Sequence, residues 1–218
     1  PDAAKRPTVC VVGHTTYGLT MADGLWRATC SCGWRSSPSP DLAEQIPWVM
    51  EACEALGVPI LTHERYEADD VIGTVVMRWL KQDRGEAVVA TTDKDLHCLI
   101  AHGARVWDHF KSEWHDHAWV ENKWGVPAAQ LPDLLALMGD ATDSVPGVSK
   151  VGLKTAAKLL RTYGTLDGIM AGAGILKDTV GEALRKERDM LYLSRQLVQL
   201  KTDVRVGVSW NMLVWDGA

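Results

Sequence analysis

Residues 67–95 read EADDVIGTVVMRWLKQDRGEAVVATTDKD, and this stretch decides the fold. From about Ala68, apolar residues recur at the spacing of one helical face. Gly85 ends the predicted helix, and Ala87–Ala90 is a continuous apolar run between turn residues. Such runs are typical of a parallel strand that is buried on both faces. A helix followed by a strand at this spacing predicts an α/β sheet. The apolar residues of the helical face are Val71, Ile72, Val75, Val76, Trp79 and Leu80.

The segments on either side extend this alternation. Asp41 can cap a helix that continues to about Leu56, and residues 58–61 read as a short buried strand. A further helix is predicted from about Leu96, with a strand near residues 105–107. Alternating strands and helices favour a parallel sheet.

The pattern changes after Pro127, where Gly- and Pro-containing turns separate three predicted helices, at 128–138, 151–163 and 182–200. We therefore expect an α/β core followed by a helical C-terminal subdomain. The expected division is an atypical N-terminal segment at 1–37, the α/β core at 38–126 and the helical subdomain at 127–218.

Acidic side chains gather in three places along this pattern. One group opens the helix at 67–70, one follows the strand at 87–90, and one follows the helical stretch at 134–138. Taken separately, they have ordinary explanations, because acids cap first helical turns and are common in turns. The carboxyl ends of strands in open α/β sheets are, however, where such proteins bind ligands. The seven residues are Glu67, Asp69, Asp70, Asp93, Asp95, Asp140 and Asp143.

If these acids converge, their mutual repulsion requires cations. Carboxylate oxygens alone favour Mg²⁺ or Mn²⁺, whereas Zn²⁺ would call for His or Cys ligands. Two such ions about 4 Å apart can activate a water and stabilise the leaving oxygen in phosphodiester hydrolysis. The pattern therefore predicts a two-metal site.

Residues 146–158 read PGVSKVGLKTAAK and form a second candidate site. A Gly-x-x-x-x-Gly turn that opens a helix presents backbone N–H groups to a phosphate. Lys150, Lys154 and Lys158 recur every fourth residue and would form one basic stripe. A helical hairpin with a solvated Lys face is the alternative. A P-loop is not indicated, since the Gly-Lys-Ser/Thr ending is absent.

Three motifs, taken in order, resemble the 5′-nuclease domain of bacterial DNA polymerase I and of stand-alone phage and bacterial 5′–3′ exonucleases. They are residues 67–73 (EADDVIG), 92–95 (TDKD) and 136–148 (ALMGDATDSVPGV). The closing residues 192–204 also fit, and the likeness runs from about Pro38 to Val204. The resemblance implies a PIN-like nuclease core that carries a helix-hairpin-helix.

The resemblance also implies roles for individual residues. Glu67 and Asp69, with Asp70 nearby, would serve a first metal ion. Asp93, Asp95, Asp140 and Asp143 would serve a second, with Glu67, Asp93 and Asp140 central to catalysis. The implied substrates are 5′ flaps, nicked or gapped duplexes and RNA primers, met in DNA replication and repair. The DNA-binding hairpin, with K⁺ as an implied ligand, would comprise Gly147, Val148, Lys150, Gly152, Lys154, Thr155 and Lys158.

Two departures from the family lie before Pro38. Family members begin with a strand that carries a metal-binding Asp, and this unit has no counterpart here. Pro1-Asp2-Ala3 resembles the end of the next strand, which makes Asp2 a candidate ligand. The chain also lacks an initiator Met, so we expect a truncated or split version of a longer protein.

The second departure is residues 9–34, which stand where the family has a mobile basic and aromatic arch. They read as a small insert containing Cys10, His14, Cys30 and Cys32. This set has the composition of a four-ligand zinc knuckle, although its Cys-x-Cys spacing is tighter than usual. Unliganded thiols in a cytoplasmic loop are the alternative.

A third cluster places His109, His115 and His117 among Trp107, Trp114 and Trp119. Spacing by two favours a strand or loop with one polar and one aromatic face over a metal site.

Charge and composition set broad limits. A net charge of −5 is unusual for a DNA-binding protein, but basic groups outnumber the acids that remain once the seven candidate ligands are set aside. The sequence has no apolar run long enough for a membrane span. Five cysteines, an odd number, favour a reducing cytoplasm, here that of a bacterium or a phage-infected one. We expect a monomer.

Three hypotheses follow. The first is a metal-dependent 5′–3′ exonuclease or flap endonuclease. The second is a catalytically impaired, truncated DNA-binding protein that keeps the hairpin but does not cut. The third is a zinc-stabilised interaction module on a degenerate nuclease.

Overall fold

The computed structural model describes residues 9–12, 19–22, 25–28 and 46–214. Its main sheet has the strand order β1-β4-β5-β6, comprising β1 (Val9–Val12), β4 (Ala87–Ala90), β5 (Arg105–Asp108) and β6 (Glu113–His115). β4 pairs in parallel with β1 on one side and β5 on the other, whereas β6 is antiparallel to β5. The parallel strands therefore end at one edge of the sheet, where the loop after β4 begins.

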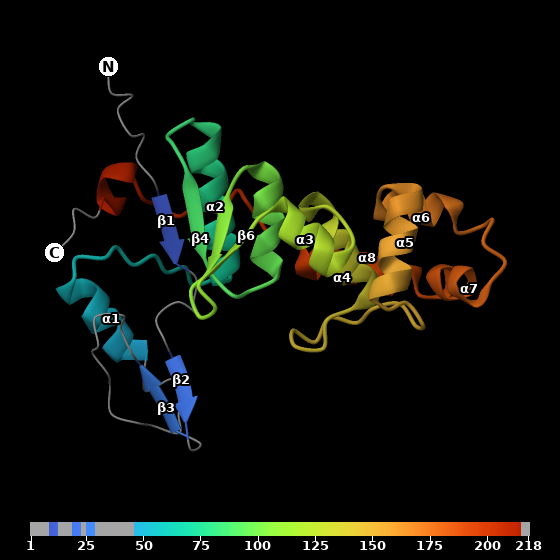
Figure 1. Ribbon diagram of the computed structural model, residues 1–218, viewed down its shortest axis with the longest axis horizontal. Helices are drawn as coiled ribbons and strands as arrows, with labels where there is room; N and C mark the ends of the chain where they lie inside the picture. Colours follow the sequence, from blue (N-terminus) through green and yellow to red (C-terminus); the bar gives the residue numbers. More distant parts are fainter. Residues whose placement is uncertain (1–8, 13–18, 23–24, 29–45, 215–218) are drawn as a thin grey trace.

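Helix α2 (Ala68–Lys81) packs against β1 and β4 (Figure 1). Its buried face carries Ile72, Val76 and Trp79, as the sequence periodicity predicts. The next segment, η2 (Asp95–His102), is a 3₁₀ helix, followed after β6 by α3 (His117–Trp124). The helix–strand unit read from residues 67–95 is confirmed.

The C-terminal part is helical and extends away from the sheet along the long axis of the molecule (Figure 1). α4 is buried along much of its length, with Leu134 and Leu137 fully buried, and packs against α5 and α8. An α/β core with a helical subdomain is thereby confirmed. The elements are η3 (Ala128–Gln130), α4 (Leu131–Met138), α5 (Leu153–Tyr163), α6 (Leu166–Gly172), α7 (Thr179–Lys186) and α8 (Arg188–Val198).

The chain then returns to the sheet as a C-terminal strap, residues 200–213, which ends in η4 (Trp210–Leu213). The Thr74 hydroxyl on α2 donates to the Lys201 carbonyl at 3.3 Å and accepts from the Val204 amide at 3.1 Å. The Trp210 ring contacts Trp79 edge-on, at 5.1 Å between centroids. The strap therefore holds α2 in place. The N-terminal end of this helix carries the candidate ligands Glu67, Asp69 and Asp70.

Two expected elements are wrong in detail. Residues 58–61 have no regular structure, because the proline at position 59 has no N–H for a ladder. Ile60 is exposed, not buried as expected. The predicted helix at 182–200 is two helices, α7 and α8, that meet at Glu187.

The N-terminal elements differ from the expected insert. β1, at residues 9–12, is a strand of the main sheet, as suits its β-branched sequence VCVV. β2 (Leu19–Ala22) and β3 (Leu25–Ala28) form a separate antiparallel pair, and α1 (Ile46–Ala55) lies nearby (Figure 1). Cys10 is thus a residue of the sheet. The other residues predicted there, Asp2, His14, Cys30 and Cys32, lie outside the described residues, so the zinc hypothesis stays a prediction.

Over the described part of the chain, no helix combines the length and the apolar character that crossing a membrane requires.

Candidate active site

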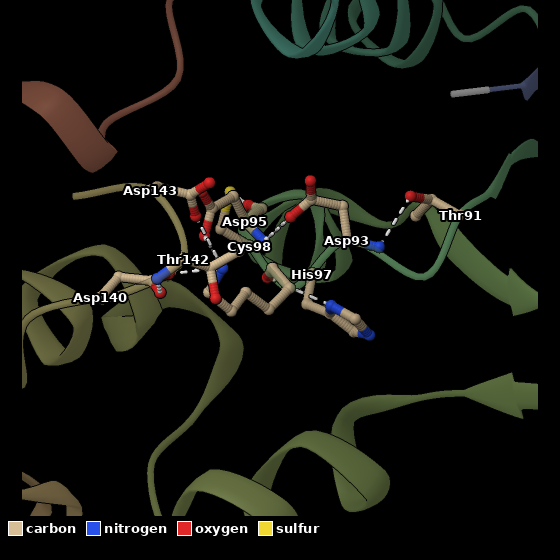
Figure 2. Close-up of polar contacts among 9 residues, drawn as sticks. Thr91, Asp93, Asp95, His97, Cys98, Asp140, Thr142 and Asp143 are labelled. Atoms are coloured by element: carbon tan, nitrogen blue, oxygen red, sulfur yellow. Dashed lines mark hydrogen bonds and ion pairs between the residues drawn. The ribbon is translucent and has the colours of Figure 1, made fainter. Parts of the chain in front are cut away.

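The loop after β4 places two acids at the carboxyl edge of the sheet. The buried hydroxyl of Thr91 accepts a hydrogen bond from the Asp93 amide at 2.9 Å. Asp93 Oδ1 in turn accepts from the Asp95 amide at 3.0 Å (Figure 2). These bonds close a turn at the start of η2, and they fix the Asp93 carboxylate and the Asp95 backbone relative to the central strand.

The second acidic loop follows α4. Asp140 and Val145 exchange two backbone hydrogen bonds, at 2.9 and 2.8 Å, which draw residues 140–145 into a tight loop. Gly139 has a φ of +74°, and a Cβ at Gly147 would overlap the backbone of Met138. Both positions therefore require glycine, which explains the spacing of the motif at 136–148.

The two loops bring three carboxylates together. Ligand atoms of Asp95, Asp140 and Asp143 all lie within 4.8 Å of one another, and Figure 2 shows them converging from the two loops. The Lys94 ammonium lies among them. It forms ion pairs with Asp140 and, at 2.8 Å, with Asp143, and it lies 3.9 Å from Asp95 Oδ1. Lys94 is thus a built-in counter-ion for the acids.

Electrostatic coupling extends this group to α2. Burial raises the pKa of Asp69 to about 7, with further contributions from Asp93, Asp95, Glu67 and Asp70. A carboxyl that holds its proton to neutral pH marks a site with an excess of negative charge.

The pKa values of Asp95 and Asp140 reflect the same balance between burial, neighbouring acids and Lys94. Burial raises the pKa of Asp95 to about 6; Lys94 opposes this rise, and Asp93 and Asp143 add to it. For Asp140, burial also acts upward, but the hydrogen bond from Lys94 and that from the Thr142 amide hold its pKa below the usual range. Lys94 therefore outweighs burial at Asp140 but not at Asp95.

The donor set fits a hard divalent cation. Asp95 Oδ1 is buried and has no hydrogen-bond partner among the described residues, which is costly for a carboxylate oxygen. Every donor of the cluster is a carboxylate oxygen, the ligand type of Mg²⁺ and Mn²⁺. A cation held by Asp95, Asp140 and Asp143 would satisfy that oxygen and offset the repulsion.

The two remaining acids of the first helical turn have different surroundings. Glu67 is the N-cap residue of α2, but its side chain makes no capping hydrogen bond. The ordinary capping role is thus absent. Asp70 Oδ1 accepts a hydrogen bond from the Lys201 amide at 2.8 Å, so this residue anchors the C-terminal strap. Asp70 thus anchors the strap, and its role as a metal ligand stays a prediction, while Asp69 is electrostatically coupled to Asp93 and Asp95.

The predicted DNA-binding hairpin divides into a buried and an exposed side. Val148 is buried, and its amide donates to the Leu137 carbonyl at 2.8 Å, so it belongs to the core. Gly147 lies against the backbone of Met138 and Gly139. Gly152 is the N-cap residue of α5, and Thr155 is half-buried. The exposed face carries Lys150, Lys154 and Lys158.

A buried histidine pair, not expected from the sequence, lies beside the site. His97 Nε2 lies 2.7 Å from His115 Nδ1, and His97 Nδ1 lies 3.1 Å from the Lys94 carbonyl. Because a carbonyl only accepts, His97 Nδ1 carries the proton and Nε2 accepts from His115 Nδ1–H. Burial lowers the pKa of His97 to about 4, which keeps it neutral. The pair holds the backbone between Asp93 and Asp95.

The surrounding His and Trp residues lie on β5, in the turn after it, on β6 and in the first turn of α3. Trp107 and Trp114 are register partners, and Trp119 stacks on His115 at 3.5 Å between centroids. Among the described residues, the group of potential ligands close enough to share an ion is the acidic one, not the histidines. No sequence signal links position 97 to position 115, because their contact depends on the packing of η2 against β6.

The fold joins an α/β domain to a C-terminal helical domain, and the acidic cluster lies between the loop after β4 and the loop after α4. A family profile described as "5'-3' exonuclease, N-terminal resolvase-like domain" matches residues 33–125. A second, "5'-3' exonuclease, C-terminal SAM fold", matches residues 126–218. The chain belongs to the 5′–3′ exonuclease family.

Curated relatives agree with this assignment. The chain is 36% identical over 204 residues to the flap endonuclease Xni of Shewanella sp. (strain ANA-3), covering 91% of this chain and 78% of that protein. It is 36% identical over 214 residues to DNA polymerase I of Rhizobium leguminosarum, covering 98% of this chain. The chain spans only 21% of that polymerase.

Among solved structures, the T5 5′-exonuclease with bound divalent metal ions (zinc) is similar, with a TM-score of 0.66 and 22% identity. The match covers 73% of this chain and 59% of that one. This likeness supports the fold.

Proposed function

We propose that the chain is a metal-dependent 5′ nuclease that hydrolyses phosphodiester bonds near the 5′ ends of flapped, nicked or primer-bearing DNA. The observation that carries this proposal is the convergence of Asp95, Asp140 and Asp143, which come from two separate parts of the chain. Asp95 also contributes to the raised pKa of Asp69 on α2. A flap endonuclease among the relatives, and a T5 flap endonuclease of similar fold solved with DNA and metal ions, support the same activity.

The proposed cofactor is a pair of Mg²⁺ or Mn²⁺ ions. Glu67 and Asp69 would hold one ion at the start of α2. Two such ions supply, when bound, a nucleophilic water at neutral pH and stabilisation of the leaving oxygen. The second ion would be held by Asp93, Asp95, Asp140 and Asp143.

The chain's own residues would divide the work. The acidic loops would hold the metal ions. The His97–His115 pair would hold the loop at 93–95 in its position after β4. The exposed Lys face of the hairpin would bind phosphates of the duplex through charge that falls off with added salt. Backbone carbonyls of the same hairpin are the proposed K⁺ ligands. Binding and cutting would thus reside in separate parts of the chain.

The test uses a duplex with a labelled 5′ flap, incubated with Mg²⁺ or with EDTA. Cleavage should require Mg²⁺, and Asp140→Asn should lower its rate by about 10²-fold or more, because even the outer-shell partners of metal ligands are worth about 10- to 100-fold. Asp189→Asn, an exposed acid on α8, is the matched control and should cut normally.

Asp93→Asn and Asp143→Asn should likewise lower cleavage far more than DNA affinity. DNA binding without cleavage under any metal condition would instead support a structure-specific binding protein. Failure to bind DNA at all would remove both readings.

We further propose that the protein acts as a monomer in the bacterial cytoplasm. Sedimentation of the purified chain, with and without DNA, tests the oligomeric state directly.

A further inference from the structure

The hairpin loop at residues 146–152 is held at two points, by Glu187 at the α7–α8 junction and by Ser194 on α8. The Ser149 amide donates to Glu187 Oε2 at 2.8 Å. The buried Ser194 hydroxyl on α8 donates to the Pro146 carbonyl. The second contact is enclosed and structural. The first lies at the surface, where Ser149 is exposed.

The amides of this loop point to two sides. The Val148 amide donates inward to the Leu137 carbonyl, and the Val151 amide donates to the Val148 carbonyl within the turn, at 2.8 and 3.0 Å. The Ser149 amide donates to a carboxylate at the surface. A carboxylate and a DNA phosphodiester are both singly charged oxygen acceptors, and both form short hydrogen bonds with backbone N–H groups.

The position of this contact coincides with the basic face of the hairpin. Lys150 follows Ser149 directly and has a left-handed φ of +65°, while Lys154 and Lys158 continue along the exposed side of α5. A phosphate chain that lies along these lysines would pass the Ser149 amide. Glu187 places a negative charge at that point, ionised because hydrogen bonds from Ser149 lower its pKa.

We infer that Glu187 is an internal stand-in for a DNA phosphate: it occupies the Ser149 amide in the free protein and is displaced when duplex DNA binds the hairpin. This inference rests on the proposed DNA-binding role of the hairpin. Binding is then an exchange of one anion for another at this amide. The carboxylate lowers affinity for bare duplex, which favours substrates that also engage the acidic site and eases release of the cut product.

A purely structural role for Glu187 predicts the opposite effect. If the carboxylate only shaped the loop for DNA, then weakening the Ser149 contact would disorder the loop and lower DNA affinity. The sign of the change in affinity therefore separates the two roles.

The experiment measures affinity for a fluorescent duplex by anisotropy, in EDTA and at fixed salt, so that metal chemistry does not contribute. The test variant is Glu187→Gln, which keeps the size and an acceptor oxygen but removes the charge. The matched control is Glu182→Gln, an exposed acid one turn earlier on α7, which makes the same change in net charge. Glu187→Ala removes the acceptor altogether.

Glu187→Gln should bind the duplex about 3- to 10-fold more tightly than the wild type, which is the scale of replacing a charged hydrogen bond with a neutral one. Glu182→Gln should change affinity by less than about twofold, the long-range effect of one charge. Glu187→Ala should bind at least as tightly as Glu187→Gln. The urea midpoints of all three variants should match that of the wild type.

Equal affinities for the Glu187→Gln and Glu182→Gln variants, or weaker binding by either Glu187 variant, would overturn the stand-in role while leaving the hairpin as a DNA site. Absence of duplex binding by the wild type and every variant would instead overturn the proposed function.

Discussion

Replacing Asp69 with Asn should stabilise the metal-free protein, although it removes a proposed metal ligand. In the folded chain, burial and four neighbouring acids raise the pKa of Asp69 from 3.8 to about 7. The folded state therefore binds this proton more tightly than the unfolded state. Its contribution to stability is fully present below pH 3.8 and is lost as the pH rises to about 7.

The size of the effect follows from the shift. One pKa unit corresponds to about 1.4 kcal/mol, so the full shift would correspond to about 4 kcal/mol. The carboxyl is partly open to solvent and titrates together with its neighbours, which reduces the expected gain of Asp69→Asn to about 1–2 kcal/mol at pH 8. Near pH 4 the difference between Asp69→Asn and the wild type should vanish.

The assay is urea unfolding followed by fluorescence of the ten tryptophans, at pH 4 and pH 8, in EDTA and in Mg²⁺. Magnesium should stabilise the wild type far more than it stabilises Asp69→Asn, which reverses their order at pH 8. Asp189→Asn controls for the change in net charge. Equal stability of Asp69→Asn and the wild type at pH 8 in EDTA would refute the inference that burial and the neighbouring acids destabilise the ionised Asp69 carboxylate. An equal response to Mg²⁺ would refute its role as a ligand.

Three further outcomes can be measured. Thr74→Val should lower the free energy of unfolding in urea by about 2–3 kcal/mol, because it leaves the buried Val204 amide without its acceptor. Thr74→Ser keeps the hydroxyl and should cost less than half of that. Equal costs for the two variants would exclude the hydrogen bonds as the cause. Lys94→Met should lower the melting temperature in EDTA and enlarge the rise in melting temperature on adding Mg²⁺, because no ammonium then competes with the metal ion for Asp140. A rise equal to that of the wild type would contradict this competition. Lys154→Ala should weaken duplex binding and reduce its salt slope by about one, with single-turnover cleavage at saturating enzyme unchanged; a slower chemical step would place this lysine in the active site.

The sequence predicts the α/β core well where a single periodic signal is long. Helix α2 and strand β4 follow from 29 consecutive residues, with a helical face, a glycine break and an apolar run. The strand predicted at 58–61 rested on only four residues, one of them a proline. Residues 58–61 belong to neither of the described sheets. The break at Glu187 has no glycine or proline to signal it, and the two helices around it share one amphipathic pattern.

The candidate site shows where sequence reasoning ends. Grouping the acids was possible because strand ends and helix starts meet at one sheet edge. Separating Asp69 from Asp70 was not, because adjacent helical residues point about 100° apart and only the packing decides which one faces the sheet. The C-terminal strap returns to α2, where the Lys201 amide donates a hydrogen bond to Asp70. This contact links positions 131 residues apart in sequence.

The two proposed ligand sites share a physical feature: each holds a side chain whose charge matches that of the ligand. Lys94 lies among the carboxylates where a divalent cation would bind, and Glu187 lies on the amide where a phosphate would bind. Lys94 offsets repulsion between buried acids in the free protein, whereas Glu187 occupies an exposed amide that water would otherwise fill. Ligand binding at both places is therefore an exchange, so the net affinity is smaller than the contacts alone would give. Removing either side chain should tighten the corresponding ligand. At the acidic site it should also destabilise the ligand-free fold, because Lys94 compensates buried charge, whereas Glu187 lies at the surface.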